Sequence, residues 1–276
     1  MTAAPLVPAI RVDSDCPPAE VRAFFERDRL LSAYALADLD RANVATARWW
    51  VARRADEITA AALLVEILPF RPTFALGEAE GLAAIFRDLR EARLIVAAPA
   101  AARPSVEQTY RFERVDRMRR MATSARAFRP RVTHEVKRLG RGDLEDLVEL
   151  YGEASRTYFT AERLEREIYF GIRIDGSIVA AAGTHVRSRD AGIAAVGNVL
   201  TRTQFRERGL GTSVTSAVTA AALEDHRDVV LNVRDANTTA IAIYERLGYR
   251  LHAGFLEGPA IRRAPWERIT NIWRRP

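Results

Sequence analysis

The sequence contains almost no cysteine and almost no lysine. Cys16 is the single cysteine among 276 residues, which excludes an intrachain disulfide and a zinc site built from cysteines. The four histidines do not have the spacing of metal ligands, so no metal is predicted. Lys137 is the single lysine, and arginine supplies every other basic side chain. We attribute this arginine bias first to genome composition, because alanine is also abundant.

Long apolar runs are also missing. No segment approaches the roughly 20 apolar residues that a membrane-spanning helix requires. Residues 1–8 have no basic stretch ahead of an apolar core, so they do not resemble a signal peptide. The sequence therefore predicts a cytoplasmic protein with no membrane partner.

The positive charge is spread evenly along the chain. The net charge is +6 and the isoelectric point is near 9.9, but residues 1–130 and 131–276 each carry +3. No block of like charges is long enough to form a nucleic-acid-binding tail. Nucleic acid is therefore not an expected partner. With 48% hydrophobic and 28% charged residues, the composition is typical of a globular protein, and the length suits two domains.

The most informative stretch is residues 191–249. An apolar strand at 193–200 precedes a loop at 201–212 that is rich in glycine and arginine. A helix follows to about residue 224, then an apolar strand at 229–233, and then a second helix from Asn237. A strand that leads through a glycine-bearing loop into a helix predicts an anion site, because the unpaired N–H groups and the helix dipole face the ligand.

The loop contains an Arg-x-x-Gly-x-Gly pattern, Arg206-Glu-Arg-Gly-Leu-Gly211. It lacks the Gly-Lys-Ser/Thr of a P-loop, and Val214 stands where a dinucleotide fingerprint needs its third glycine. A second pattern follows at residues 231–249, Leu-Asn-Val-Arg-Asp-Ala-Asn-x-x-Ala-x-x-x-Tyr-x-x-x-Gly-Tyr. Together the two patterns resemble the GNAT superfamily of acyl-CoA-dependent N-acyltransferases. The closest likeness is to the branch that includes the glycine N-acyltransferases, and it covers about residues 131–252.

The resemblance implies a mixed sheet whose fourth and fifth strands separate at one end to admit the pantetheine arm of the cofactor. Pantetheine would pair with the backbone of residues 198–200, and the N–H groups of residues 208–212 would hold the pyrophosphate. Residues at helical spacing after position 237 would line the same ligand. The implied cofactor-binding residues are Asn198, Val199, Leu200, Thr201, Arg206, Arg208, Gly209, Leu210, Gly211, Thr212, Asn237, Ala240 and Tyr244. Individually, Asn237 and Gly248 are also typical helix caps.

The reaction implied by the resemblance is direct attack of an amine on the thioester of acetyl-CoA or another acyl-CoA. Tyr244 matches the family tyrosine that protonates the departing thiolate, and a backbone N–H near Val199 would stabilise the oxyanion. Glu153 is the leading candidate for the base, with a water relay as an equal alternative. His185 is a second candidate for the base, but it is expected about 13 Å from Asn198 along the strands, which favours a local structural role.

Other polar and aromatic residues favour structural roles. Glu165 and Glu167 are expected to be solvated helix charges. Tyr158 and Phe159 either belong to the core or line an acceptor pocket.

The first half repeats the order of elements expected in the second half. It reads as helices at 17–41, a hairpin at 49–65, a strand at 70–76, a helix at 78–89 and strands at 92–98 and 109–121. Its equivalent loop, residues 76–81, carries two carboxylates and no arginine, and these would repel a pyrophosphate. We therefore expect a degenerate GNAT-like domain at 1–130 that does not bind CoA, ended by a linker at 122–130.

The second half is predicted to be the catalytic domain, residues 131–276. Its expected elements are strands at 132–139 and 249–255, helices at 143–151 and 155–167, and a hairpin at 169–186 that turns at Asp175-Gly176. The tail with Trp266, Ile269 and Ile272 is a candidate for one more strand.

The sequence thus predicts an α/β protein of the GNAT fold, with a mixed, mostly antiparallel sheet in two tandem GNAT-like domains. The expected acceptor is a small-molecule amine or amino acid, and the expected assembly is a monomer or homodimer. Two alternatives stay open: an acetyltransferase for protein N-termini or lysines, and a non-catalytic acyl-CoA-binding regulatory module.

Overall fold

The computed structural model describes residues 8–66 and 70–264, and these form two compact units. The first unit consists of the chain up to residue 118 together with the chain from residue 254. The second unit consists of residues 119–253. The predicted tail strand with Trp266, Ile269 and Ile272 lies outside the described residues.

The first unit has a mixed sheet in the order β1-β2-β3-β4-β5-β13, with β6 paired to β13. Among the described residues of this unit, β4 and β5 pair in parallel and the other registers are antiparallel. The strands are β1 (Ile10–Asp13), β2 (Ala47–Arg54), β3 (Glu57–Val65), β4 (Pro72–Gly77), β5 (Arg93–Ala98), β6 (Tyr110–Phe112) and β13 (Arg250–Arg262). The helices are α1 (Pro18–Glu26), α2 (Ala33–Asp38), α3 (Ala79–Asp88) and α4 (Arg103–Glu107), with short 3-10 turns η1 (Val44–Thr46) and η2 (Ala100–Ala102).

Apolar side chains on both faces of this sheet are buried. Leu82, Ile85 and Phe86 of α3 pack in one core with Ala60 and Ala62 of β3. On α1, the ring of Phe25 contacts the ring of Phe74 on β4, with centroids 5.7 Å apart. The run Glu57–Val65, apolar on both sides, is explained by this double burial.

The second unit has a mixed sheet in the order β7-β12-β11-β10-β9-β8. The strands are β7 (Asp116–Ser124), β8 (Lys137–Arg138), β9 (Tyr169–Ile174), β10 (Ser177–Ser188), β11 (Ile193–Thr201) and β12 (Asp228–Arg234). The helices are α5 (Leu144–Tyr151), α6 (Ala161–Arg166), α7 (Leu210–Asp225) and α8 (Thr238–Arg246), with 3-10 turns η3 (Arg141–Asp143), η4 (Glu153–Thr157) and η5 (Thr203–Phe205).

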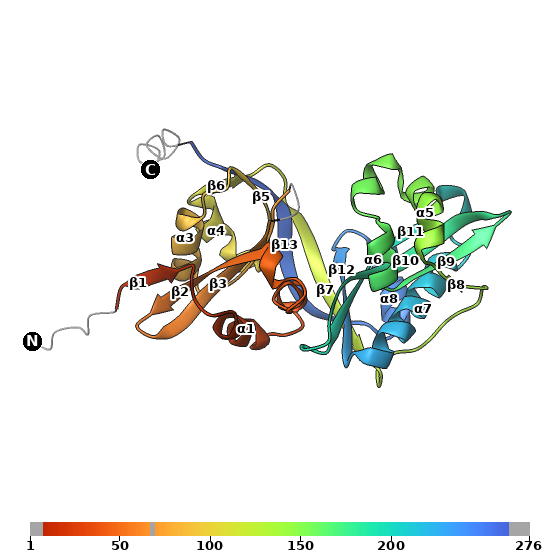
Figure 1. The fold of residues 1–276 in the computed structure, drawn as a ribbon, viewed down its shortest axis with the longest axis horizontal. Helices are drawn as coiled ribbons and strands as arrows, with labels where there is room; N and C mark the ends of the chain where they lie inside the picture. The colour runs from red at the N-terminus through yellow and green to blue at the C-terminus, as the bar shows by residue number, and fades with distance from the viewer. Residues whose placement is uncertain (1–7, 67–69, 265–276) are drawn as a thin grey trace, which may run out of the picture. The chain divides into compact units, whose positions relative to one another are not determined.

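Helices cover both faces of this second sheet (Figure 1). Side chains alternate along β10, so Ala180 and Ala182 enter the core under α7 and α8, while Ala181 enters the core under α5 and α6. Small residues on α7 let the helix lie close to the sheet, and Val214 and Val218 on it are fully buried. The result is a three-layer α/β domain.

The boundary between the units differs from the predicted one at residue 130. The chain passes from the first unit to the second between residues 118 and 119, within β7. It returns to the first unit between residues 253 and 254, within β13. β7, from the end of the first half, extends the second sheet beside β12, and β13, from the end of the chain, extends the first sheet beside β5. The order of elements along the chain does not reveal which sheet β7 and β13 join, because strand pairing is set by the tertiary structure.

Two shorter segments also differ from expectation. Residues 122–124, predicted to be linker, continue strand β7. Of the predicted strand 132–139, only Lys137–Arg138 pairs with β9. The backbone N–H groups of Arg131 and Thr133 instead donate to the side chains of Ser216 and Ser213 on α7, at 2.8 and 3.1 Å.

No helix in residues 8–66 and 70–264 has both the length and the apolar character needed to cross a membrane.

Candidate functional site

Strands β11 and β12 separate at one end of the second sheet. Their parallel register runs from Ile193 opposite Asp228 to Val196 opposite Leu231. β11 continues to Thr201, but beyond Val196 its register is with β10 on its other side. The backbone of the later residues of β11 is therefore placed beside an opening in the sheet.

A loop at the end of β11 leads into the N-terminus of α7. Gly209 is the N-cap residue, with φ +81°, a left-handed conformation that glycine adopts without steric cost. The first N–H groups of α7 have no partner within the helix and point toward the loop. Arg206 and Arg208 are exposed on the same loop, and the guanidinium of Arg208 lies over the ring of Phe205 at 5.5 Å. This segment has the geometry of an anion site.

Helix α8 begins beside β12 and carries the third set of predicted residues. The side chain of Asn237 accepts a hydrogen bond from the N–H of Ala240 at 3.1 Å, so Asn237 is the N-cap. Ala240 is half-buried and Tyr244 is 7% exposed. Burial raises the pKa of Tyr244 to about 12, and its hydroxyl has no hydrogen-bond partner among the described residues. Tyr244 is thus a neutral donor near the buried side of α8.

Two β-bulges interrupt the pairing of β10 with β11. Asn198 and Val199 together lie opposite the single residue Ala182, so β11 has one extra residue there. His185 is the extra residue on β10, opposite the step from Val196 to Ala195. Asn198 has φ +51°, a left-handed conformation inside a strand.

The two bulges bring a polar cluster together. His185 Nε2 lies 2.9 Å from Asn198 Oδ1, and Asn198 Nδ2 donates to the hydroxyls of Tyr158 and Tyr169 at 3.0 Å each. The hydroxyl of Tyr151 donates to the backbone carbonyl of Asn198. Three tyrosines and a histidine from α5, the η4–α6 segment, β9 and β10 therefore surround one asparagine of β11.

The position of His185 corrects the sequence-based estimate. Counting strand residues put it about 13 Å from Asn198, but the bulges shift the register and bring the two side chains into hydrogen-bonding contact. Its predicted structural role, with a local partner, agrees with this contact. Burial lowers the pKa of His185, although its bond to Asn198 opposes the shift.

Arg163 on α6 makes hydrogen bonds to the same cluster. Its guanidinium donates to the Tyr158 hydroxyl and, at 2.8 Å, to the backbone carbonyl of His185. It also lies over the Tyr158 ring at 4.0 Å. Burial raises the pKa values of Tyr151 and Tyr158 above the ordinary tyrosine value, so both hydroxyls stay protonated at neutral pH.

Glu153 does not join this cluster. Its side chain is 75% exposed and forms an ion pair with Arg156, Nε to Oε1 at 2.5 Å. The hydrogen bond from Arg156 lowers the pKa of Glu153, which makes this carboxylate a weaker base. The geometry therefore does not favour Glu153 as the acceptor of the amine proton.

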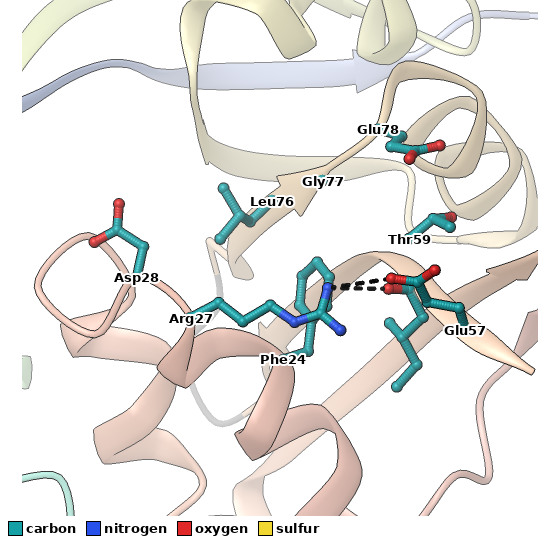
Figure 2. Close-up of a pocket in the computed structure, with 9 residues that line it drawn as sticks. Phe24, Arg27, Asp28, Glu57, Thr59, Leu76, Gly77 and Glu78 are labelled. Carbon is teal, nitrogen blue, oxygen red and sulfur yellow. Dashed lines mark hydrogen bonds and ion pairs between the residues drawn. The ribbon is translucent and has the colours of Figure 1, made fainter.

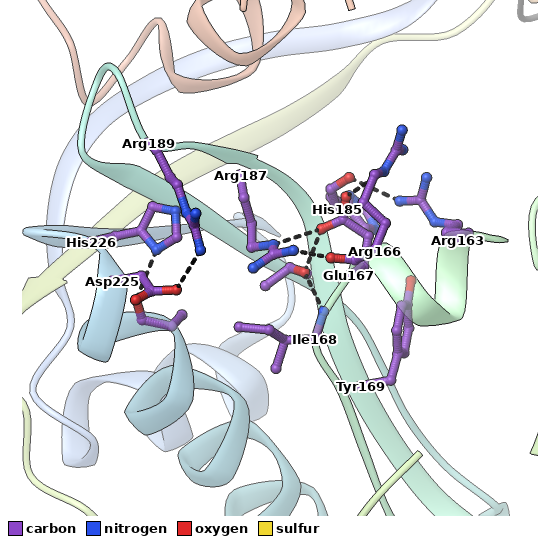
Figure 3. A network of polar contacts seen from close by, with 12 residues as sticks. Arg163, Arg166, Glu167, Ile168, Tyr169, His185, Arg187, Arg189, Asp225 and His226 are labelled. Atoms are coloured by element: carbon purple, nitrogen blue, oxygen red, sulfur yellow. Dashed lines mark hydrogen bonds and ion pairs between the residues drawn. The ribbon is translucent and has the colours of Figure 1, made fainter. Parts of the chain in front are cut away.

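Glu167 is buried, contrary to the expectation of a solvated charge (Figure 3). Its carboxylate accepts a hydrogen bond from Thr184 Oγ1 at 2.7 Å and pairs with Arg166 and Arg187 at 3.2 and 3.3 Å. A buried carboxylate held by two guanidiniums is a structural anchor between α6 and β10. Glu165 is exposed, as expected, and pairs with Arg141.

The first unit has a small pocket of about 350 Å³ beside α1 (Figure 2). Phe24, Ile58 and Leu76 supply apolar walls, and the charged groups at its rim are neutralised by neighbours. Arg27 lies 4.0 Å from Glu57 and donates to the carbonyl of Ile58, while Glu78 pairs with Arg54 at 2.7 Å. Two of the carboxylates at this rim, Glu57 and Glu78, are thus paired with arginines.

Sequence reasoning missed the role of Tyr151, Tyr169 and Arg163 in the cluster. For the rings of Tyr169 and His185, a signal was present in a pair of glycines in two β-strands. A Cβ on Gly197 would lie 2.5 Å from His185 Nε2, and a Cβ on Gly183 would overlap the ring of Tyr169. Each glycine makes room for one ring of the cluster.

No group of three or more His, Cys, Asp and Glu side chains that could hold a metal ion exists in the part of the chain that the structure describes.

Comparison with known proteins agrees with this architecture. Residues 169–255 match the model of a family described as FR47-like protein, a GNAT-related family. No curated protein matches the sequence significantly.

Several solved structures share the fold over most of the chain. A GCN5-related N-acetyltransferase from Sphaerobacter thermophilus has 17% identity and a TM-score of 0.60, covering 92% of this chain and 96% of its own. One from Kribbella flavida has 18% identity and a TM-score of 0.59, covering 86% and 95%. A tandem GNAT protein from the clavulanic acid biosynthesis pathway has 13% identity and a TM-score of 0.57, covering 93% and 99%. At these identities the likeness shows the fold, two GNAT-like domains in tandem.

Proposed function

We propose that the chain is a GNAT-superfamily protein and that its second unit transfers the acetyl group of acetyl-CoA to a primary amine of a small molecule or amino acid. The observation that carries this proposal is the combination of an opening between β11 and β12 with a glycine-capped helix N-terminus at its end. The opening suits an extended pantetheine arm, and the helix N-terminus suits the pyrophosphate.

The chain's own groups have distinct roles in this proposal. The backbone of Asn198, Val199, Leu200 and Thr201 pairs with pantetheine as an added strand. The N–H groups from Arg208 through Gly209, Leu210 and Gly211 to Thr212 hold the pyrophosphate, with Arg206 and Arg208 contributing charge-assisted contacts. Asn237, Ala240 and Tyr244 line the cofactor from α8.

The chemistry is addition followed by elimination. The amine nitrogen attacks the thioester carbonyl carbon, and the oxyanion that forms is stabilised by a backbone N–H at Val199. The C–S bond then breaks, the thiolate takes a proton from the Tyr244 hydroxyl, and Tyr244 regains a proton from water. The amine loses its proton to water, since the polar cluster around Asn198 contains no carboxylate.

Calorimetric titration with acetyl-CoA tests the cofactor site. The wild-type chain is expected to bind with a Kd near micromolar, about 8 kcal/mol. Gly209→Glu should abolish binding, because it puts a carboxylate at the pyrophosphate position and a side chain at φ +81°. Gly176→Glu is the matched control: Gly176 also has φ +81°, has open space around it, and lies in the β9–β10 turn.

Of the two variants, only Gly209→Glu should show no heat of acetyl-CoA binding in the titration. Equal loss in both variants would attribute the effect to backbone strain, and no binding by the wild type would refute the proposal.

A further inference from the structure

Asn198 has a conformation that strands rarely contain. Its φ of +51° costs energy for any residue with a side chain, although asparagine tolerates it better than most. A left-handed residue inside a strand persists only where its surroundings hold it in place. The cluster around Asn198 supplies such surroundings.

Every polar group of the Asn198 side chain is already engaged. A side-chain amide has two N–H donors and one oxygen acceptor. Both donors are taken by the hydroxyls of Tyr158 and Tyr169, and the oxygen faces His185. The amide therefore has no N–H left to donate to a substrate.

The same geometry sets the tautomer of His185. With the Asn198 oxygen facing His185, Nε2 carries the proton in this contact, because an amide oxygen can only accept. A nitrogen that already holds a proton and donates it to an amide cannot take another from an amine. His185 is thus a hydrogen-bond donor at this position.

We infer that Asn198 and His185, with Tyr158 and Tyr169, form a lock that fixes the bulge in β11 and so aims the adjoining Val199 N–H at the reacting carbonyl. This rests on the proposed acetyl transfer. Asn198 and His185 are positioning residues, and His185 Nε2 is not the atom that accepts the amine proton.

Paired substitutions distinguish positioning from base catalysis. His185→Gln keeps an N–H donor and should retain kcat within about threefold, whereas His185→Leu should lower kcat about 10- to 100-fold. Asn198→Gly tolerates the left-handed backbone but removes the lock, and should lower kcat to a similar extent. In both His185 variants the Kd for acetyl-CoA should change by less than about threefold.

Two results would overturn the lock. One is an equal loss of kcat in His185→Gln and His185→Leu, with the acidic limb of the pH–rate profile removed, which would make His185 the base. The other is full activity in Asn198→Gly.

A spectroscopic measurement separates this inference from the proposed function. In ¹⁵N-histidine NMR spectra, with His185 assigned from His185→Gln, the ring should be neutral with its proton on Nε2. Asn198→Gly should shift that resonance. A proton on Nδ1 refutes the lock whether or not the protein is active. Absence of acetyl transfer to any amine, with the Nε2–H tautomer present, would refute the function and leave the lock intact.

Discussion

In the resting protein the Tyr244 hydroxyl stays protonated at neutral pH, so it has a proton available to donate. It is 7% exposed, its ring lies 6.0 Å from that of Tyr249, and burial raises its pKa to about 12. The hydroxyl is therefore protonated at neutral pH and has a proton to donate, although its transfer to a thiolate is uphill, because a thiol has a pKa of about 8.5. Burial supplies this property without a charged neighbour.

Tyr244→Phe should lower kcat about 10- to 100-fold, within the usual range for a general acid, and change the Kd for acetyl-CoA by less than about threefold. The check is steady-state kinetics beside calorimetry, between pH 6 and 10. Because the pKa lies near 12, Tyr244 should cause no fall of kcat in that window. A wild-type decline with a midpoint near pH 9 that disappears in the variant would contradict this assignment.

Asp38 on α2 is a carboxyl group whose charge the fold does not compensate. It forms no hydrogen bond or ion pair within the described chain, and burial, together with the nearby Asp40, raises its pKa to about 7. A raised pKa means that the folded state holds a proton that the unfolded state has released. Stability is therefore lost as pH rises from about 4 through 7.

Asp38→Asn should stabilise the protein by about 1–3 kcal/mol at pH 8, a rise in Tm of several degrees, and by almost nothing at pH 4.5. Thermal denaturation at the two pH values measures the difference. Asp56→Asn, in an exposed hairpin turn, is the control and should show no such pH dependence. A stabilisation of equal size at both pH values would mean that charge is not the cause.

At the scale of elements, the two facing bulges require glycine at particular positions. A methyl group on Gly197 would lie 2.5 Å from His185 Nε2, so the imidazole would have to move away from Asn198. Overpacking of this kind typically costs about 1–3 kcal/mol.

Gly197→Ala should lower the free energy of unfolding by that amount, measured by urea denaturation. Gly142→Ala is the matched control, because no atom lies within 4 Å of the added methyl group. If both variants unfold alike, the ring of His185 has room to move and the crowding argument is wrong.

The elements were easier to predict than their register. Apolar periodicity located α5 and α7, and Asp175-Gly176 located the β9–β10 turn, because these signals are local. The polar cluster depends on one extra residue in each of two strands, and a bulge leaves no local pattern. A one-residue shift moves side chains to new neighbours, which is why counting along the strands put His185 far from Asn198.

At the scale of the whole molecule, two halves with the same order of elements differ where the cofactor would bind. In the second unit a loop from Arg202 to Gly209 joins β11 to α7. In the first unit β4 ends at Gly77 and the next residue, Glu78, is already the N-cap of α3. Because β7 and β13 each cross between the two compact units, neither half of the sequence corresponds to one compact unit, which the order of elements alone could not reveal.

Among the described residues of the first unit, the turn between β4 and α3 is shaped and charged differently from the loop before α7. This short turn brings Gly77 so close to Ala60 that even a Cβ would overlap it. Glu78 and Glu80 put negative charge at the N-terminus of α3, and both pair with Arg54, at 2.7 and 3.0 Å. The helix dipole is thus already satisfied by the chain's own carboxylates.

Calorimetry should therefore find one acetyl-CoA bound per chain, and Gly209→Glu should remove all of the heat instead of half of it. The double substitution Glu78→Gln with Glu80→Gln removes the repulsion in the first unit but leaves the turn closed. Its stoichiometry should stay at one. A stoichiometry of two in the wild type, or a second site in the double variant, would show that the first unit also binds the cofactor and that geometry there does not exclude it.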